Sequence, residues 1–421
     1  MTLEQMIRNS METMLERFSR HNCGDFIDTK FDVETGEDFA QEDSYRGKSH
    51  VYGWIQAQGI ESLAKHAQWF ENHGNSPFAN KLDKMLDKVL DATLDAIEKN
   101  GDVLPFVMAP DGTPYHKLST RQGYGDLFLG KGLLAAARRL NDTLLTKEAH
   151  YRFTNAINAL KDGQFRSDQL FLNPITPVEY VPGKKVHGPR TAALDGLADF
   201  LEAMPDERFW LDTGMECING VLQQYIMLPV INKQMYHYEM TEAIDKHGVP
   251  WRENGVVISA PGHSMEYFGH LARFLKAARR FPEVAYYELN KGMGLLYTAI
   301  ACYVFSYGYS REAHGMVKTF DLTNYKKLDT DMPSRSLTAA VRTMHLIDEL
   351  YPDLGECPSA VKRKQTALDD FQKYYLRPSG FAVKTRDAQG NVVKDCHEIP
   401  DADPGYYTNL PLLECGELKL Q

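Results

Sequence analysis

Cysteine is sparse in this sequence, and its spacing excludes the usual cysteine frameworks. The 421 residues contain 6 cysteines, and no two of them form a CxxC pair. They are Cys23, Cys217, Cys302, Cys357, Cys396 and Cys415. Scattered cysteines in a long chain are typical of a reducing compartment, whereas disulfide and zinc frameworks cluster them. We therefore expect free thiols and a cytoplasmic protein.

Leader peptides and membrane-spanning runs are also missing from the sequence. Residues 1–5 have neither the basic head nor the apolar core of a signal peptide. The longest uncharged stretch, residues 292–310, contains three glycines and several tyrosine, serine and threonine side chains. This mixture predicts a buried inner helix rather than a membrane span.

Positive charge is in deficit. The chain has 47 Lys and Arg against 57 Asp and Glu, and its formal net charge is −10. No basic run interrupts this balance, so a phosphate-backbone surface is not expected. We expect neither nucleic acid nor a membrane among its partners.

Linkers and low-complexity segments are absent, and helical periodicity recurs from end to end. An apolar side chain at every third or fourth position predicts amphipathic helices. The predicted helices cover residues 2–20, 53–72, 79–99, 126–141, 147–161, 189–204, 206–225, 261–280, 285–305, 334–351 and 359–375. Without a boundary between them, these helices predict one domain over residues 1–421.

The connections between these helices alternate between short turns and long loops rich in glycine and proline. Long loops cover residues 103–117, 172–189 and 321–333, and the clearest β-hairpin covers residues 380–393. Helices in sequential pairs with such loops predict an all-α protein, an (α/α)6 barrel with a few short β-hairpins. A superhelical repeat array is the alternative, although no fixed-period motif is visible.

The sharpest local feature is the segment that begins Pro261-Gly262-His263. Proline is favoured in the first turn of a helix, where its missing N–H needs no partner. Helical spacing then places His263, Glu266, Tyr267 and His270 on one face. The opposite face is apolar and consists of Met265, Phe268, Leu271, Ala272 and Leu275. Four proton-handling side chains thus share one stripe.

Two simpler interpretations of this stripe remain open. It could be the solvated face of a surface helix, which is the usual place for a lone histidine. It could also bind a metal through His263 and Glu266, because His/Glu pairs three residues apart do so in helical bundles. A second pair of ligands at matching spacing is missing from the sequence.

The segment Pro261-Gly262-His263-x-x-Glu266 resembles the signature helix of the N-acylglucosamine 2-epimerase family, which includes cellobiose epimerases and mannose isomerases. Weaker similarities follow in the family's order, at residues 48–56, 124–137, 239–255 and 395–400. The resemblance implies an (α/α)6 barrel, a sugar as ligand, no cofactor and no metal. Relatives in the family are often homodimers.

The sequence departs from the family pattern at several positions. Gln58 stands where the family has an arginine, and Ser336 occupies the place of a glutamate on the late helix. Where mannose isomerases carry a histidine near the start of the middle helix, this chain offers His187 and Arg190. These differences leave the substrate and the reaction open.

The family resemblance implies a reaction in which a base removes the proton beside the carbonyl of an open-chain sugar. Histidine suits this role because its pKa lies near neutrality. We expect His263 and His397 to form the catalytic pair, brought together by the fold. The expected sugar-binding residues are Glu266, Arg190, Tyr124, Trp54, Gln58, Arg335, Trp251 and His187.

Two other functions remain compatible with the sequence. A glycoside hydrolase or lyase on the same barrel would need two carboxylates across the site. Its candidates are Asp126, Glu239, Glu242 and Asp331. A non-catalytic sugar-binding relative is the other alternative, because the arginine and the glutamate of the family are replaced.

Overall fold

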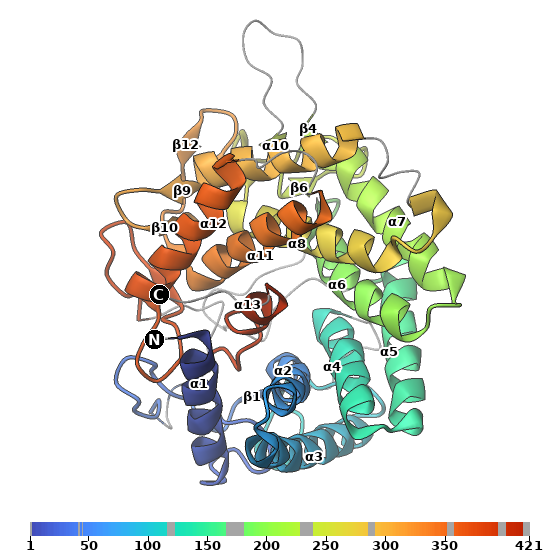
Figure 1. The fold of residues 1–421 in the computed structure, drawn as a ribbon, viewed down its shortest axis with the longest axis vertical. Helices are drawn as coiled ribbons and strands as arrows, with labels where there is room; N and C mark the ends of the chain where they lie inside the picture. Colours follow the sequence, from blue (N-terminus) through green and yellow to red (C-terminus); the bar gives the residue numbers. More distant parts are fainter. Residues whose placement is uncertain are drawn as a thin grey trace, which may run out of the picture.

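The computed structural model describes residues 2–40, 43, 45–115, 123–165, 181–227, 239–284, 291–351, 358–394 and 401–415. Its helices form two concentric rings (Figure 1). The inner ring consists of α2 (Gly53–Asn72), α4 (Tyr124–Leu140), α6 (Gly188–Ala203), α8 (Pro261–Ala278), α11 (Ser334–Leu350) and the short α13 (Leu410–Glu414). The outer ring consists of α1 (Leu3–Phe18), α3 (Ser76–Lys99), α5 (Thr143–Lys161), α7 (Arg208–Gln224), α10 (Lys291–Gly308) and α12 (Pro358–Asp370), which continues into the π-helical turn η2 (Phe371–Tyr375).

Inner and outer helices alternate along the chain, and the two chain ends supply the last pair. Each inner helix from α2 to α11 packs against the outer helix that follows it. The short α13 lies inside, and α1 lies outside it (Figure 1). The amide of Asn409 donates to Ser10 Oγ at 2.9 Å and joins these two segments. The ring closes, which confirms the predicted (α/α)6 barrel and excludes an open repeat array.

The long uncharged stretch is helical, as predicted. Its position in the barrel differs from the prediction of an inner helix. The helix α10 packs against α8, α11 and α12 and belongs to the outer ring. Its described side chains are mostly buried because neighbouring helices and the strand β5 (Glu239–Met240) cover it. A helix without charged residues is expected to be buried, but its sequence does not indicate which ring it occupies. In the described part of the chain, no helix has the length and apolar character to cross a bilayer.

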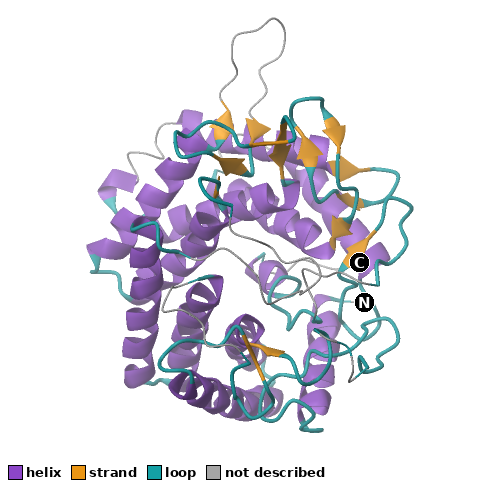
Figure 2. Cartoon of the chain, turned by 180° about the vertical axis from the view of Figure 1, so that it is seen from behind, coloured by secondary structure: helices purple, strands orange, loops and turns teal. Residues whose placement is uncertain are grey.

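Short strands gather at the N-terminal ends of the inner helices (Figure 2). β1 (Val51–Tyr52), β3 (Lys185–Val186), β8 (Val256–Ser259) and β13 (Met332–Pro333) lead directly into α2, α6, α8 and α11. The other strands are β2 (Val107–Met108), β4 (Ile226–Met227), β5, β6 (Ala243–Ile244), β7 (Arg252–Glu253), β9 (Tyr309–Ser310), β10 (Gly315–Met316), β11 (Phe320–Asp321), β12 (Lys326–Lys327) and β14 (Thr385–Arg386). All pairings are antiparallel among the described strands, and the largest sheet has the order β12-β11-β8-β7.

The predicted hairpin over residues 380–393 exists in a reduced form. Its turn is present, with the Gly390 N–H donating to the Asp387 carbonyl at 3.0 Å. A single bridge joins Arg386 to Val392, while β14 pairs with β13. The segment therefore pairs more with β13, which leads into α11, than with itself as a hairpin.

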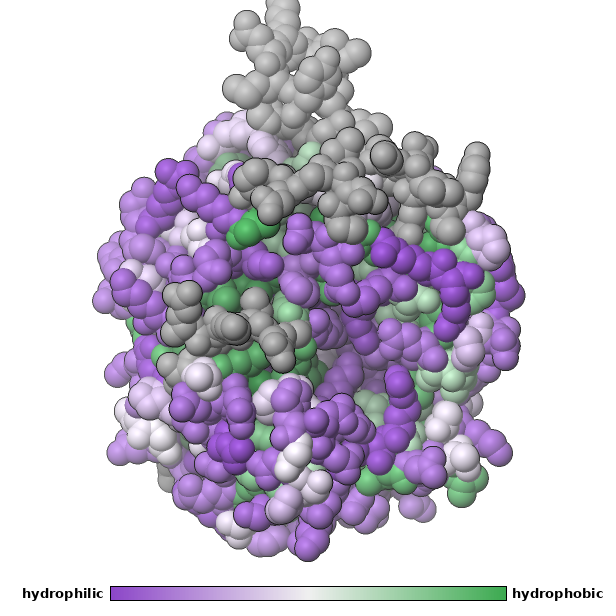
Figure 3. Space-filling view, viewed as in Figure 1, coloured by the Kyte–Doolittle hydropathy of each residue, from purple (hydrophilic) through white to green (hydrophobic). Residues whose placement is uncertain are grey.

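The hydrophobic core fills the space between the two rings. On α3 the predicted apolar stripe is buried, with Leu82, Leu86 and Val89 at 0% exposure. Burying each such side chain stabilises the fold by about 1.5–3 kcal/mol. The outer surface is mostly hydrophilic, and apolar residues become visible toward the middle of the ring (Figure 3). The four cysteines within the described residues, Cys23, Cys217, Cys302 and Cys415, are buried free thiols.

Candidate functional site

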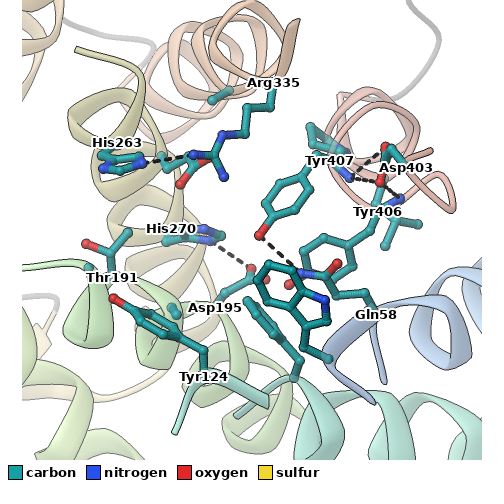
Figure 4. A pocket seen from close by; sticks show the side chains of 18 of the residues that line it. Gln58, Tyr124, Thr191, Asp195, His263, His270, Arg335, Asp403, Tyr406 and Tyr407 are labelled. Carbon is teal, nitrogen blue, oxygen red and sulfur yellow. Dashed lines mark hydrogen bonds and ion pairs between the residues drawn. The ribbon is translucent and has the colours of Figure 1, made fainter. Parts of the chain in front are cut away.

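A cavity of about 410 Å³ lies inside the inner ring. Its walls come from α2, α4, α6, α8 and α11, from Glu242 beside β6, and from residues 401–414. The volume falls in the range of small-molecule sites. Side chains from both ends of the chain thus face one enclosed space (Figure 4).

Most of the residues predicted to bind a sugar line this cavity. They are Trp54, Gln58, Tyr124, His187, Glu266 and Arg335, and His263, predicted as a catalytic residue, lines the cavity with them. Arg190 does not line it, because its guanidinium lies beside Gly220 of α7 and interacts with Tyr225. Trp251 does not line it either, and its backbone N–H donates to the Ala243 carbonyl of β6. His397 lies outside the described residues.

The imidazole of His263 is held between a carboxylate and a guanidinium. Its Nδ1 lies 3.0 Å from Glu242 Oε1, and its Nε2 lies 3.1 Å from Arg335 Nη2. A guanidinium can only donate, so in the neutral imidazole Nε2 carries the lone pair and Nδ1–H donates to Glu242. The side chain is 38% exposed, and this exposed part faces the cavity. A basic nitrogen with a fixed tautomer therefore points into the site.

Glu242 joins His263 to a second imidazole. Its Oε2 lies 3.3 Å from Nε2 of His187, which is fully buried and contacts Thr191 Oγ1 through Nδ1 at 3.0 Å. Burial would raise the pKa of Glu242, but the two imidazoles hold it well below its usual range. Burial would lower the pKa of His263, but the Glu242 carboxylate raises it above 6.5. The carboxylate thus makes His263 a stronger base.

The Pro-Gly-His segment has this shape because two inner helices meet closely at their first turns. Pro261 occupies the first turn of α8, directly after β8. A Cβ on Gly262 would lie 2.2 Å from Ser336 Oγ at the start of α11, so a larger residue would push the helices apart. Glycine at this position therefore brings His263 within reach of Arg335 on α11.

One turn further along α8, Glu266 presents a carboxylate to the same cavity. It forms no hydrogen bond or ion pair with any other residue in the described ranges. The predicted stripe is wrong at one position, because Tyr267 is fully buried and its hydroxyl donates to the Ile218 carbonyl of α7 at 3.2 Å. The cavity face of α8 therefore carries His263, Glu266 and His270. The opposite apolar face is buried as predicted.

Deeper in the cavity, His270 repeats the arrangement of His263. Its Nδ1 lies 2.9 Å from Asp195 Oδ1, and Arg342 Nη2 lies 3.1 Å from its Nε2 and 3.3 Å from its Nδ1. Asp195 also pairs with Lys131 and accepts from Arg273 at 2.7 Å. Burial lowers the pKa of His270, and the Arg342 charge lowers it further. His270 is therefore neutral at physiological pH.

Ion pairs surround His270, and their positive and negative charges balance. The four carboxylates of this network within the described residues are Glu61, Asp195, Asp199 and Glu414, and its four cations are Lys65, Lys131, Arg273 and Arg342. We call these residues and His270 the His270 cluster. We call Glu242, His187, His263 and Arg335 the His263 cluster.

Aromatic side chains complete the walls. Tyr406 accepts a hydrogen bond from Lys131 at 2.9 Å, and Tyr407 accepts one from Gln58 Nε2 at 3.1 Å. A Cβ on Gly188 would lie 2.6 Å from the Tyr124 hydroxyl, so glycine allows that hydroxyl to approach the start of α6. Sugars present apolar ring faces as well as hydroxyls, and this wall matches both.

Sequence reasoning missed part of this site. Arg342 follows Arg335 by seven residues, as His270 follows His263, and this shared spacing was a usable signal. No sequence signal pointed to Tyr406 and Tyr407, because they follow a loop without periodicity. Of the carboxylates proposed for hydrolysis, Glu242 lines this cavity, whereas Asp126, Glu239 and Asp331 do not. Asp126 instead caps α4 by accepting from the Gly123 N–H at 3.0 Å.

Metal binding finds no support in the geometry of the described ranges. They contain no group of three or more His, Cys, Asp or Glu side chains placed to hold an ion. Among the described residues, His263 and Glu266 have no further ligands of the kind that a metal site of the bundle type would need.

The sequence matches no protein-family model and no curated protein. The fold, however, is similar to several solved structures. A sugar epimerase from a ruminal bacterium has a TM-score of 0.67 at 11% identity over 97% of each chain. D-mannose isomerase has 0.65 at 10% identity, covering 96% of this chain and 97% of that one. Cellobiose 2-epimerase from Spirochaeta thermophila has 0.65 at 13% identity, covering 98% and 96%.

Hydrolases share this fold as well. An unsaturated glucuronyl hydrolase specific for heparin has a TM-score of 0.53 at 10% identity, covering 97% of this chain and 95% of that one. At such identities the likeness shows the (α/α)6 barrel alone, because one fold supports different reactions. The resemblance seen in the sequence is confirmed at the level of the fold.

Proposed function

We propose that this protein interconverts sugars without a cofactor, as a sugar 2-epimerase or an aldose–ketose isomerase. The observation that carries the proposal is the His263 imidazole in the cavity wall, where Glu242 holds its Nδ1–H at 3.0 Å and its Nε2 accepts from Arg335 at 3.1 Å. A base of this kind removes the proton beside a carbonyl, where it is most acidic.

The neighbours of His263 fit the remaining requirements of the reaction. As the C–H bond breaks, negative charge develops on the carbonyl oxygen and needs a positioned donor. Arg335 Nη2 lies 3.1 Å from His263 Nε2 and carries a permanent positive charge beside the base. When the sugar displaces this contact, the guanidinium can donate to the sugar oxygen while His263 takes the proton.

Other cavity residues would bind the rest of the sugar. Glu266 offers an unpaired carboxylate for hydroxyl groups, and Tyr124 and Trp54 offer aromatic surface. His187 would act through Glu242, because its side chain is fully buried. His397 remains our proposal for a second proton-carrying group if the reaction is an epimerisation, which must return the proton to the opposite face. Mannose and cellobiose, named in the similar structures, are the first sugars to try.

A glycoside hydrolase is the less favoured alternative. Hydrolysis needs two carboxylates in different protonation states across the bond that breaks. In the described ranges, Glu242, Asp195, Glu61, Glu414 and Asp401 line the cavity in ion pairs, and Asp403 accepts backbone N–H groups of its own loop. This leaves Glu266 without a matching partner for hydrolysis. A non-catalytic sugar-binding protein is the remaining alternative.

The test is proton exchange at C2 of a free sugar in deuterated water. We expect the wild-type protein to place deuterium at C2 of mannose, cellobiose or a related aldose, as NMR would show, and to form a new sugar. His263→Asn should lower the turnover by about 10²–10⁴-fold while its helical circular dichroism is unchanged. Cleavage without exchange would identify a hydrolase. A thermal shift by a sugar without any turnover would identify a binding protein.

A further inference from the structure

A phenol hydroxyl faces the proposed site from the wall formed by the C-terminal segment. Tyr407 lines the same cavity as His263 and Arg335, and it belongs to the segment that leads into α13 (Figure 4). The Arg335 guanidinium lies between the two, in contact with His263 Nε2 at 3.1 Å and with its Cζ 5.5 Å from the Tyr407 ring centroid. A sugar bound beside Arg335 would therefore have the imidazole and the phenol on different sides.

The hydrogen bond from α2 leaves the phenolic proton available. Gln58 Nε2 donates to the Tyr407 oxygen at 3.1 Å, so that oxygen is already an acceptor. No group in the described ranges accepts the proton of this hydroxyl. Tyr407 is only partly buried and lines the cavity, so an oxygen of a ligand bound there can accept this proton.

The position of Tyr407 is fixed by its backbone. Its N–H donates to the Asp403 carboxylate at 3.1 Å, and its carbonyl accepts from Thr338 Oγ1 of α11 at 2.7 Å. Asp403 also accepts from the backbone N–H groups of Tyr406 and Thr408. Preorganised donors cost no reorganisation when charge develops on a substrate, so a phenol held in this way suits catalysis.

Tyr407 would act as an acid and not as a second base. Burial raises the pKa of its phenol to about 12, although the Arg335 charge opposes this effect. At neutral pH the phenol is protonated and cannot take a proton from carbon. Epimerisation needs a second group to exchange the carbon-bound proton on the opposite face, whereas aldose–ketose isomerisation needs one base on one face.

We propose, building on the function above, that Tyr407 donates its proton to the carbonyl oxygen of an open-chain aldose and that the protein is an aldose–ketose isomerase with His263 as its single base. His263 Nε2 takes the C2 proton, and the C2–H electron pair forms the C1=C2 bond. The carbonyl π pair moves to O1, which takes the Tyr407 proton. The tyrosinate then takes the proton of the O2 hydroxyl, C2=O forms, and His263 returns its proton to C1.

The experiment compares Tyr407→Phe with wild type on mannose and cellobiose in deuterated water. Wild type should form the ketose and no 2-epimer. Tyr407→Phe should lower kcat by about 10²–10³-fold with little change in KM, because the lost donor acts in the transition state. Wild-type turnover by Tyr407→Phe, or a 2-epimer as the wild-type product, would overturn this inference and leave the proposed function intact. If wild type neither formed a new sugar nor exchanged the C2 proton, both proposals would be overturned.

Two further variants keep the result interpretable. Gln58→Leu removes the donor to Tyr407 and should lower kcat by about tenfold, whereas adding it to Tyr407→Phe should cost nothing more. Wild-type kcat for Gln58→Leu would overturn the inference even if Tyr407→Phe did not fold. Tyr267→Phe is the matched control, because its buried hydroxyl donates to the Ile218 carbonyl away from the cavity. It should retain wild-type turnover.

Discussion

Two histidines on one helix have the same partners and opposite properties. His263 and His270 lie seven residues apart on α8, and each has a carboxylate at Nδ1 and an arginine within 3.1 Å of Nε2, although Arg342 also contacts Nδ1 of His270. The two arginines, Arg335 and Arg342, lie seven residues apart on α11. Two helical turns repeat each contact almost in register, so the helix pair builds the same triad twice.

The surroundings of the triads decide the difference. The carboxylate of His270 is Asp195, which also pairs with Lys131 and Arg273, so its charge is already compensated. The carboxylate of His263 is shared only with an imidazole among the described residues. The His270 side chain is 10% exposed, whereas the His263 side chain is 38% exposed. Consequently the pKa of His270 is lowered and that of His263 is raised. The contacts of an imidazole do not determine its pKa alone, because cations that compete for the partner carboxylate matter as much.

The largest expected effect comes from breaking the His270 cluster. Lys131 is 1% exposed and pairs with Asp195 and Glu61, so Lys131→Met removes a buried cation that two carboxylates share and leaves them with Arg273 and Lys65 alone. We expect the free energy of unfolding to fall by about 3–5 kcal/mol, as urea denaturation would measure. Arg335→Met in the more open His263 cluster should change it by about 1 kcal/mol or less. Equal losses would show that the two clusters do not differ in structural role.

The next effect concerns the base itself. Glu242→Gln keeps the shape of the side chain and removes the charge that raises the pKa of His263. Without the carboxylate the imidazolium is less favoured, so the pKa of His263 falls and the neutral base persists at lower pH. The acid limb of kcat/KM should move to lower pH, and its plateau should fall by about 10²-fold. A limb that stays in place or moves to higher pH would contradict the role given to Glu242.

The smallest effect separates two arginines that sequence reasoning treated alike. Arg190 lies on the inner helix α6 but faces Gly220 and Tyr225 of the outer layer, whereas Arg335 faces the cavity. Arg190→Met should retain turnover within about twofold, as expected of a substitution away from the site. The steady-state rate on the best sugar of the panel would measure this. A large loss would place Arg190 in the reaction and weaken the assignment of Arg335.

The sequence predicted the helices better than the site. Periodicity predicted the helices to within a few residues, because local spacing determines an amphipathic stripe; the start of the predicted helix 285–305 lies outside the described residues. It placed α10 in the wrong ring and Tyr267 on the wrong face, because a run of buried residues does not reveal what covers it. Glu242 and Tyr407 reach the cavity from loops, where no periodicity links them to His263. Their distances from His263 depend on the closure of the ring, and local sequence patterns do not encode this closure.

The most direct test of this account is the titration of both imidazoles by NMR on protein labelled with nitrogen-15. We predict that the pKa of His263 lies above 6.5 and that of His270 below it. In the neutral form, the proton of His263 should reside on Nδ1, leaving Nε2 as the base. A pKa of His270 above that of His263, or a neutral His263 with its proton on Nε2, would contradict the account.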